Sequence, residues 1–388
     1  MPLTAPPLSL YVHMPWCVKK CPYCDFNSHG LRGAPPPYAE YVELLLADLD
    51  ADLRDFGEAA RQRHIVSVFF GGGTPSLFAP ELIARFLDGA RERLPFAADC
   101  EITLETNPGT VEHGRFDGYL QAGVNRLSFG IQSFDDDKLR RLGRIHSAAE
   151  AEAAVKSAQD AGYANLNLDL MYALPAQTLD GALADVERAV ALAPTHLSHY
   201  QLTLEPNTAF AANPPPLPDD DHAWAMQEAC EARLAQAGYA QYEISAYAQP
   251  GRRCAHNLNY WQFGDYLGIG AGAHGKLSDA AAGTVRRRWK TRHPRAYMEA
   301  AGGPGRIGGD GPVAADELPF EYMLNALRLV DGVPMADFTA RTGLAPGRIA
   351  SALAEGRRRG WLLDDPHRLC TTPLGQRFLN DVIAAFLG

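Results

Sequence analysis

"PWCVKKCPYCDFNSH", residues 15–29, places Cys17, Cys21 and Cys24 within eight positions of the chain. The thiols are separated by three residues and then by two, and no second C-x-x-C pair completes the usual ligand set of a structural zinc ion. A single loop with this spacing can direct three thiolates at three irons of a cubane and leave the fourth iron without a protein ligand. We therefore interpret Cys17, Cys21 and Cys24 as ligands of a [4Fe-4S] cluster.

A zinc ion completed by His13 or His29 is the alternative interpretation of this loop. Lys19 and Lys20 favour the cluster, because nearby positive charge stabilises a thiolate relative to a thiol. The other cysteines stand alone in the sequence, and we interpret each as a small buried side chain rather than a ligand. These are Cys100, Cys230, Cys254 and Cys370.

The composition narrows the class of protein. A chain of 388 residues that is 46% hydrophobic is long enough for one large domain and a smaller one. Its net charge of −10 argues against a general nucleic-acid or anionic-membrane surface. The one basic run, VRRRWKTR at 285–292, is expected to be a solvated or anion-facing strand. No stretch approaches the ~18 apolar residues of a membrane span and the N-terminus lacks a signal peptide, so we expect a cytosolic protein with reduced thiols.

Short β-rich runs alternate with amphipathic helical segments, which indicates repeated βα units and a parallel sheet. In YAEYVELLLADL, residues 38–49, apolar residues recur every three to four positions, as expected of a helix that packs outside a sheet. Six such units fall short of a closed eight-unit barrel, and the gap would admit a large ligand. The predicted fold class is therefore α/β, with a partial (β/α)6 barrel.

Three parts are expected along the chain. Residues 1–206 form the barrel core, residues 207–305 complete the barrel with further strands and helices, and residues 306–388 form a mostly helical, winged-helix-like domain. Because the chain as a whole is acidic, we do not expect that last domain to bind DNA.

Several predicted strands carry polar residues or glycine where they end. Ligands of parallel α/β sheets bind at the carboxyl ends of the strands, so these positions should line one site. They are Gly73, Thr74, Glu105, Gln132 and Asp169.

The C-x3-C-x2-C motif after a first strand, with Tyr23 just before the third cysteine, resembles the radical S-adenosylmethionine (SAM) superfamily. FFGGGTPS at 69–76 is similar to its glycine-rich segment, where bare backbone approaches the methionine amino group. The resemblance implies that SAM chelates the open iron. Within the superfamily the chain resembles the oxygen-independent coproporphyrinogen oxidase family, through YVHMPWC, LETNPG, FGIQSF, LGRIHS, DLMYALPAQT and TTPLGQRFLN.

The resemblance also implies a set of SAM-binding positions. Tyr11, Gly73 and Glu105 would lie beside the SAM bound at the cluster. Other positions match residues that contact SAM in the oxidase, some of them a second SAM molecule, and whether one or two bind here is left open. These are Tyr23, Thr74, Gln132, Arg144 and Asp169.

Two departures from the oxidase pattern favour the heme-chaperone branch of the family. Phe26 stands where the oxidase has a further cysteine, and only ten residues precede Tyr11, where the oxidase has an extension that encloses its substrate. Radical chemistry needs a site closed against water, so the loss of that extension argues for another use of the cluster. The resemblance then implies binding of heme and its transfer to acceptor proteins such as respiratory heme enzymes. The alternatives are oxidative decarboxylation of coproporphyrinogen III and an unrelated radical SAM reaction.

The stretch HNLNYW, residues 256–261, is the expected heme-binding motif. His256 could ligate the iron, and Tyr260 and Trp261 could stack on the porphyrin. A structural histidine between two core aromatics is the alternative. His13, His29 and His274 are rival ligands, and the oligomeric state is left open, with a dimer as one option.

Overall fold

One sheet of twelve strands forms the centre of the computed structural model, which describes residues 2–31, 33, 35–109, 115–300 and 302–387. The strands are β1 (Leu8–Met14), β4 (Ile65–Gly72), β5 (Phe96–Thr106), β6 (Arg126–Gln132), β7 (Leu166–Tyr172), β8 (His196–Gln201), β9 (Ala240–Glu243), β10 (Ala246–Ala248), β11 (Asp265–Ile269), β12 (His274–Asp279), β13 (Thr284–Lys290) and β14 (Ile307–Pro312). Their order is β14-β13-β12-β11-β1-β4-β5-β6-β7-β8-β10-β9.

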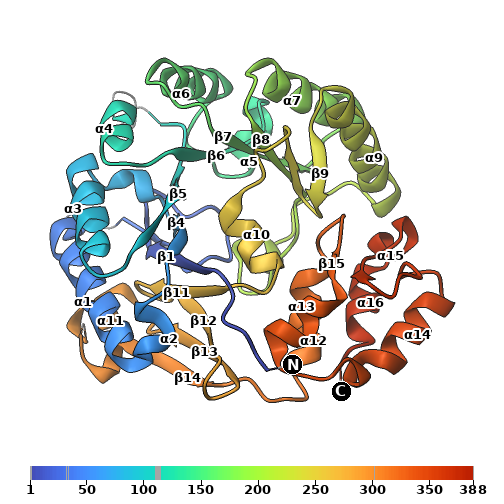
Figure 1. Ribbon diagram of the computed structural model, residues 1–388. Helices are drawn as coiled ribbons and strands as arrows, with labels where there is room; N and C mark the ends of the chain where they lie inside the picture. The colour runs from blue at the N-terminus through green and yellow to red at the C-terminus, as the bar shows by residue number, and fades with distance from the viewer. Residues whose placement is uncertain (1, 32, 34, 110–114, 301, 388) are drawn as a thin grey trace.

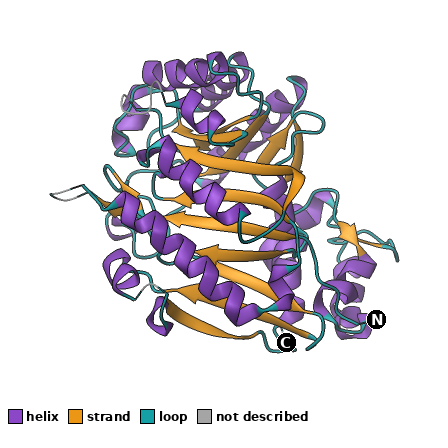
Figure 2. Cartoon of the chain, turned by 60° about the vertical axis from the view of Figure 1, so that its left-hand side comes forward, coloured by secondary structure: helices purple, strands orange, loops and turns teal. Residues whose placement is uncertain are grey.

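The six strands β1 and β4 to β8 are parallel, as the βα alternation predicts. The helices that follow them lie around the outside of the curved sheet (Figure 1), and Figure 2 shows the strands as a ladder crossed by helices. These helices are α1 (Tyr38–Phe56), α2 (Glu58–Arg61), α3 (Pro80–Arg91), α4 (Phe116–Gln121), α5 (Asp136–Arg141), α6 (Ala148–Asp160) and α7 (Leu179–Ala191). The prediction of an α/β fold with a partial barrel is confirmed.

Further strands extend both edges of this parallel core. β11 pairs with β1 in parallel, and β12, β13 and β14 then add antiparallel to it in turn. On the other side β10 and β9 add antiparallel beyond β8. The chain between these strands forms α8 (Ala209–Ala212), α9 (Asp220–Gln236), α10 (Ala255–Trp261) and α11 (Pro294–Glu299). Because β9 and β14 are the two ends of the strand order, the sheet does not close on itself.

The apolar face of α1 packs against the sheet. Tyr41, Leu45 and Leu49 recur at four-residue spacing on one side of the helix and are fully buried in the main core. That spacing places side chains one above the other on a single helix face. The sequence pattern of this segment is therefore sufficient to explain its place outside the barrel.

The basic run on β13 does not face solvent as a whole. Arg288 Nη1 lies 2.7 Å from Asp52 Oδ1, and Lys290 Nζ lies 2.8 Å from Asp52 Oδ2. Both cations and Asp48, which also pairs with Lys290, are buried between α1 and β13. Of the two expectations for this strand, solvation is wrong for these two cations, while the anion-facing alternative holds, with the chain's own carboxylates as the anions.

The C-terminal part has a core of its own. Tyr322 and Phe338 are fully buried there, and the N-terminal segment joins it through buried Leu3 and through Thr4, whose N–H donates to Ala340 O at 2.8 Å. Figure 1 shows the N-terminus beside α12 and α13. The elements are α12 (Leu318–Ala326), β15 (Val333–Pro334), α13 (Met335–Thr342), α14 (Ala350–Arg358), β16 (Arg368–Leu369), α15 (Pro373–Arg377) and α16 (Leu379–Ala384). β15 and β16 form a small antiparallel ribbon, as expected of a winged-helix-like domain.

The four isolated cysteines are all buried, as predicted. Among the described residues, no helix has the length and apolar character needed to cross a membrane.

Candidate functional site

The cysteine loop is closed at its base by two very short parallel strands, β2 (Trp16–Cys17) and β3 (His29–Gly30). The N–H of His29 donates to Pro15 O at 2.7 Å, and that of Leu31 donates to Cys17 O at 2.9 Å. These hydrogen bonds hold the two ends of the loop side by side. All three thiols are therefore presented by one anchored loop beyond the end of β1.

The three thiols line one cavity of about 130 Å³. All are half-buried and free, and Cys24 Sγ lies 3.4 Å from Ser28 Oγ. Burial raises the pKa of Cys17, and a hydrogen bond from the Thr74 hydroxyl opposes that effect. An all-thiolate donor set suits iron and sulfide.

No three His, Cys, Asp or Glu side chains in the described part of the chain are placed to hold one metal ion. Three thiolates of a cubane each bind a different iron, so they surround a volume and do not converge on a point. His13 has both ring nitrogens occupied, Nδ1 at 3.0 Å from Tyr11 Oη and Nε2 at 3.0 Å from Asn27 O. The residues therefore fit a cluster better than the zinc alternative.

Glycine at 72 and 73 lets β4 pass close to the start of the cysteine loop. A Cβ at Gly73 would lie 2.5 Å from Trp16 O, and Gly72 has a φ of 110° with no room beside the His13 ring. The N–H of Gly73 donates to Met14 O at 2.8 Å, and the N–H of Thr74 donates to Trp16 O at 2.7 Å. A side chain at either glycine would displace the loop.

Seven of the predicted SAM positions line the same cavity as the thiols. They are Tyr23, Gly73, Thr74, Glu105, Gln132, Arg144 and Asp169. Tyr11 and His256 do not join them but line a second, larger cavity. Glu105 and Asp169 line both cavities, so the two share a wall.

Arg144 reaches this cavity from the loop after α5. Its Nη1 lies 3.7 Å from Cys21 Sγ, and its Nη2 donates to Asn107 Oδ1 and to Gly130 O. The chain thus supplies fixed positive charge at the cluster position.

Glu105 lies on the shared wall at the end of β5. Burial, and then the negative charge of Asp169, raise the pKa of Glu105 to about 8. The Gly72 N–H donates to Glu105 Oε2 at 3.1 Å, and this hydrogen bond and the positive charge of Arg126 both lower the pKa of Glu105. Together they do not outweigh the effect of burial. Burial also raises the pKa of Asp169. Near neutral pH the Glu105 carboxyl is therefore mostly protonated.

Sequence reasoning missed several residues of this cavity. Asn107 donates through Nδ2 to Thr74 Oγ1 at 2.7 Å, and Tyr200 Oη donates to Gln132 Oε1 at 2.9 Å. Gln132 itself has a φ of 74°, a conformation that costs energy and clusters at functional sites. Asn107 lies in LETNPG, and Tyr200 lies at the end of β8, so the strand-end signal could have found both.

The second cavity is about 810 Å³ in volume and is bounded by α10, β11, β12 and β13 together with the inner strands. Figure 1 shows α10 in the middle of the view, inside the ring of strands. Beside polar residues and the shared carboxyls, its lining includes several aromatic side chains and two arginines. These residues are Tyr11, Phe69, Tyr260, Trp261, Tyr266 and Trp289 with Arg126 and Arg292.

His256 lies in the wall of this cavity and is only 2% exposed. Its ring stacks on Phe69 at 4.9 Å and meets Tyr260 edge-on at 4.8 Å. Nδ1 lies 2.9 Å from Ser67 Oγ, while the buried Nε2 has no hydrogen-bond partner among the described residues. Burial lowers the pKa of His256 to about 3, so the imidazole is neutral.

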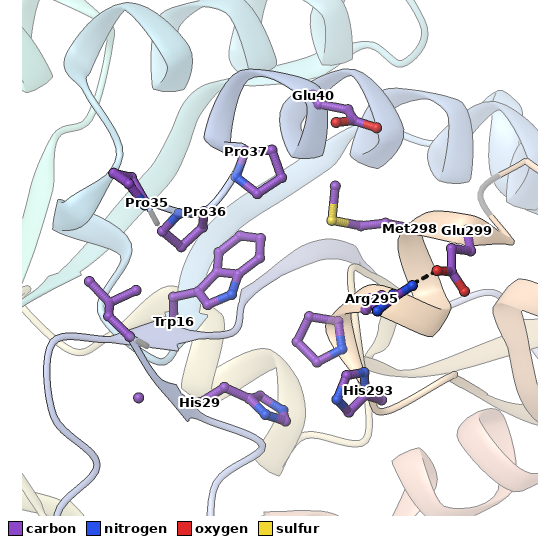
Figure 3. A pocket seen from close by; sticks show the side chains of 13 residues that line it. Trp16, His29, Pro35, Pro36, Pro37, Glu40, His293, Arg295, Met298 and Glu299 are labelled. Atoms are coloured by element: carbon purple, nitrogen blue, oxygen red, sulfur yellow. Dashed lines mark hydrogen bonds and ion pairs between the residues drawn. The ribbon is translucent and has the colours of Figure 1, made fainter. Parts of the chain in front are cut away.

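Two further residues of the cysteine loop are placed differently from each other. Phe26 lines both cavities and is 61% exposed. His29 lies outside both cavities and lines a third pocket of about 520 Å³, where it faces His293 at a ring distance of 5.7 Å (Figure 3).

Comparison with known proteins gives consistent matches. A model of the radical SAM superfamily matches residues 11–189, and a model of the HemN C-terminal domain matches residues 313–378. The chain is 51% identical over 383 residues to the heme chaperone HemW of Escherichia coli (strain K12), covering 98% of both proteins. It is 49% identical over 382 residues to the heme chaperone HemW of Haemophilus influenzae, again covering 98% of both.

Among solved structures, the chain is similar to coproporphyrinogen III oxidase (HemN) from Escherichia coli, a radical SAM enzyme. The TM-score is 0.82 with 23% identity, over 99% of this chain and 90% of that one. At this identity the likeness concerns the fold alone.

Proposed function

Because this chain belongs to the HemW family of heme chaperones within the radical SAM superfamily, we propose that it binds heme in the 810 Å³ cavity and passes it to acceptor proteins. Acceptors such as respiratory heme enzymes, and action in the cytosol, are part of this proposal.

The observation that carries the proposal is the shape and lining of this cavity. A volume of about 810 Å³ lies within the roughly 300–1,000 Å³ of cofactor sites. Tyr260 and Trp261 offer apolar faces for a flat macrocycle, and Arg126 and Arg292 offer partners for its carboxylates. Arg126 is 2% exposed, and its Nε has no hydrogen-bond partner among the described residues. Its ion pair with Glu101 Oε2 is long, at 3.9 Å, so the guanidinium can still donate hydrogen bonds to an incoming carboxylate.

The thiol cavity would hold the [4Fe-4S] cluster through Cys17, Cys21 and Cys24, with SAM beside it. When bound, these groups supply one-electron chemistry at an open iron. The chain's own contribution is positional: Arg144 places positive charge beside the Cys21 sulfur, and Glu105, which is protonated near neutral pH in the empty cavity, would ionise beside a cationic ligand. The other predicted SAM positions line the same cavity and would enclose the ligand.

Decarboxylation of coproporphyrinogen is not part of the proposed function, although reductive cleavage of SAM is compatible with it. The exposed Phe26 stands at the boundary of the two cavities, where the oxidase has a cysteine. An open mouth suits release of a bound ligand better than containment of a radical.

Anaerobic incubation of the reconstituted protein with heme and an apo heme protein tests the proposal. We expect stoichiometric heme uptake, followed by transfer that activates the acceptor. A parallel incubation with SAM, reductant and coproporphyrinogen III should yield no protoporphyrinogen. Formation of protoporphyrinogen, or failure to take up heme, would overturn the proposal. Cys17→Ser supplies the matched control, with loss of iron and sulfide expected.

A further inference from the structure

The side chains that could ligate a heme iron in the large cavity can be compared one by one. Among the described residues, its lining includes the imidazoles of His13, His256 and His274 and the phenols of three tyrosines, but no cysteine or methionine. The inference below rests on the proposed heme-binding function.

Two of the imidazoles are not free to bind a metal. His13 is 4% exposed, and both of its ring nitrogens are hydrogen-bonded, to Tyr11 Oη and to Asn27 O. His256 has one nitrogen occupied by Ser67, and its other nitrogen is buried between aromatic neighbours without accessible surface. An iron atom could reach His256 Nε2 only if neighbouring side chains moved.

The phenols are also poor ligands. A tyrosine ligates iron as the phenolate, and burial raises the pKa of Tyr11, Tyr260 and Tyr266 above its ordinary value. The hydroxyl of Tyr266 is further occupied by Arg287 Nη1 at 2.6 Å. These side chains therefore serve the cavity as aromatic walls.

His274 differs from all of them. It is the first residue of β12 and is exposed at the cavity, and within the described part of the chain no hydrogen bond to its ring is recorded. Burial of part of the ring, with Arg287 and Arg292 nearby, lowers its pKa, so near neutral pH the imidazole carries a free lone pair.

The neighbouring strand holds this imidazole in place. His274 pairs directly with Trp289 on β13, and their rings stack at 6.2 Å with an angle of 20°. The indole in turn lies flat on β14, where a Cβ at Gly309 would fall 1.9 Å from the ring. The imidazole thus packs on the Trp289 indole, which in turn packs on the glycine backbone of β14.

We infer that His274 is the axial ligand of the heme iron, that Trp289 orients its imidazole, and that His256 forms part of the cavity wall. A single exposed imidazole would hold the iron by one bond, which would suit a carrier that must release its cargo to an acceptor protein.

The test compares three alanine variants of the full-length protein. We expect His274→Ala to shift the Soret band of the ferric heme complex, remove the nitrogen-ligand signature in electron paramagnetic resonance and weaken heme binding at least about tenfold. Free imidazole should restore the signature. His256→Ala should keep the wild-type signature, as should His222→Ala, an exposed histidine on α9 outside the cavity.

A His274→Ala variant that keeps the wild-type Soret band and resonance would overturn the inference, and so would loss of both in His256→Ala alone. If wild-type protein takes up no heme, the proposed function falls first and the inference falls with it. For Trp289, the Phe variant should keep a single ligand geometry, while the Ala variant should give heterogeneous resonances. Identical spectra from both would remove its orienting role.

Discussion

At the scale of single residues, the protonation state of Glu105 determines the charge of the wall that the two cavities share. Glu105 faces both cavities, and its carboxyl is held protonated near neutral pH by burial and by Asp169. Arg126 and the Gly72 N–H act in the opposite direction but are outweighed. A cationic ligand at this wall would reverse that balance, because opposite charge nearby favours the carboxylate.

SAM binding should therefore release a proton from Glu105. Since the pKa of Glu105 in the empty protein is about 8, affinity for SAM should rise roughly tenfold from about pH 6.5 to about pH 8 and level off above. Isothermal titration of the cluster-loaded protein in buffers of different ionisation enthalpy measures both the affinity and the proton release.

Glu105→Gln is the matched control for this pH dependence, because the ligand's own titration is common to both proteins. The variant should bind SAM with a flatter pH profile. Parallel profiles in wild type and Glu105→Gln would contradict the assignment.

At the scale of elements, the added strands β11 and β12 are fixed to the parallel core by a buried ionic cluster. Asp265 accepts hydrogen bonds from Lys276 Nζ at 2.8 Å, from Arg63 Nη1 at 2.8 Å and from the Ser278 N–H at 2.8 Å. Both Asp265 and Lys276 are buried. Because β12 carries His274, this cluster also sets the position of the inferred iron ligand.

Asp265→Ala should destabilise the protein by about 3–5 kcal/mol, because it leaves the buried ammonium of Lys276 without its partner. Urea unfolding measures this change. The double variant Asp265→Leu with Lys276→Met should recover part of the loss, since it removes both charges.

Glu299→Ala serves as the control for this measurement. Its ion pair with Arg295 on α11 is exposed and screened by solvent, so the change should leave the stability nearly unaltered. An Asp265→Ala variant no less stable than this control would contradict a structural role for the cluster.

At the scale of the whole molecule, the C-terminal part contacts the wall of the large cavity. Arg328, which follows α12, lies over the Trp261 ring at 4.2 Å and pairs with Glu243 on β9 at 3.0 Å. Trp261 lines the large cavity. Arg328 of the helical domain thus contacts both the sheet edge and the cavity wall.

Arg328→Ala should weaken heme binding about fivefold, because a partly desolvated cation–π contact contributes about 1 kcal/mol to the position of the indole. SAM affinity should not change, since Arg328 does not line the thiol cavity. Heme and SAM titrations of the same preparation measure both effects.

Arg253→Ala is the control, because Arg253 also joins the C-terminal part, through Asp331 at 2.8 Å, but the ring that it covers is Tyr242, which does not line the large cavity. Equal heme affinities for the two variants would show that Arg328 acts only as a general tether.

The sequence determined by itself those features that depend on short separations or on strand ends. Cys17, Cys21 and Cys24 share one loop, so their spacing alone predicts a common ligand. Glu105, Gln132 and Asp169 meet because parallel strands place their carboxyl ends at one edge. Neither prediction needs knowledge of how distant segments pack.

Only the tertiary structure decided which side chains face which cavity. In the sequence His256 was the expected heme ligand and His13, His29 and His274 were its rivals. In the structure both ring nitrogens of His13 are hydrogen-bonded, His256 is enclosed, His29 lines another pocket and His274 is exposed. Lys290 of the basic run pairs with Asp48 and Asp52, which lie on a helix more than two hundred residues away in the sequence. Burial and hydrogen-bond satisfaction are properties of contacts between distant segments, and no local pattern encodes them.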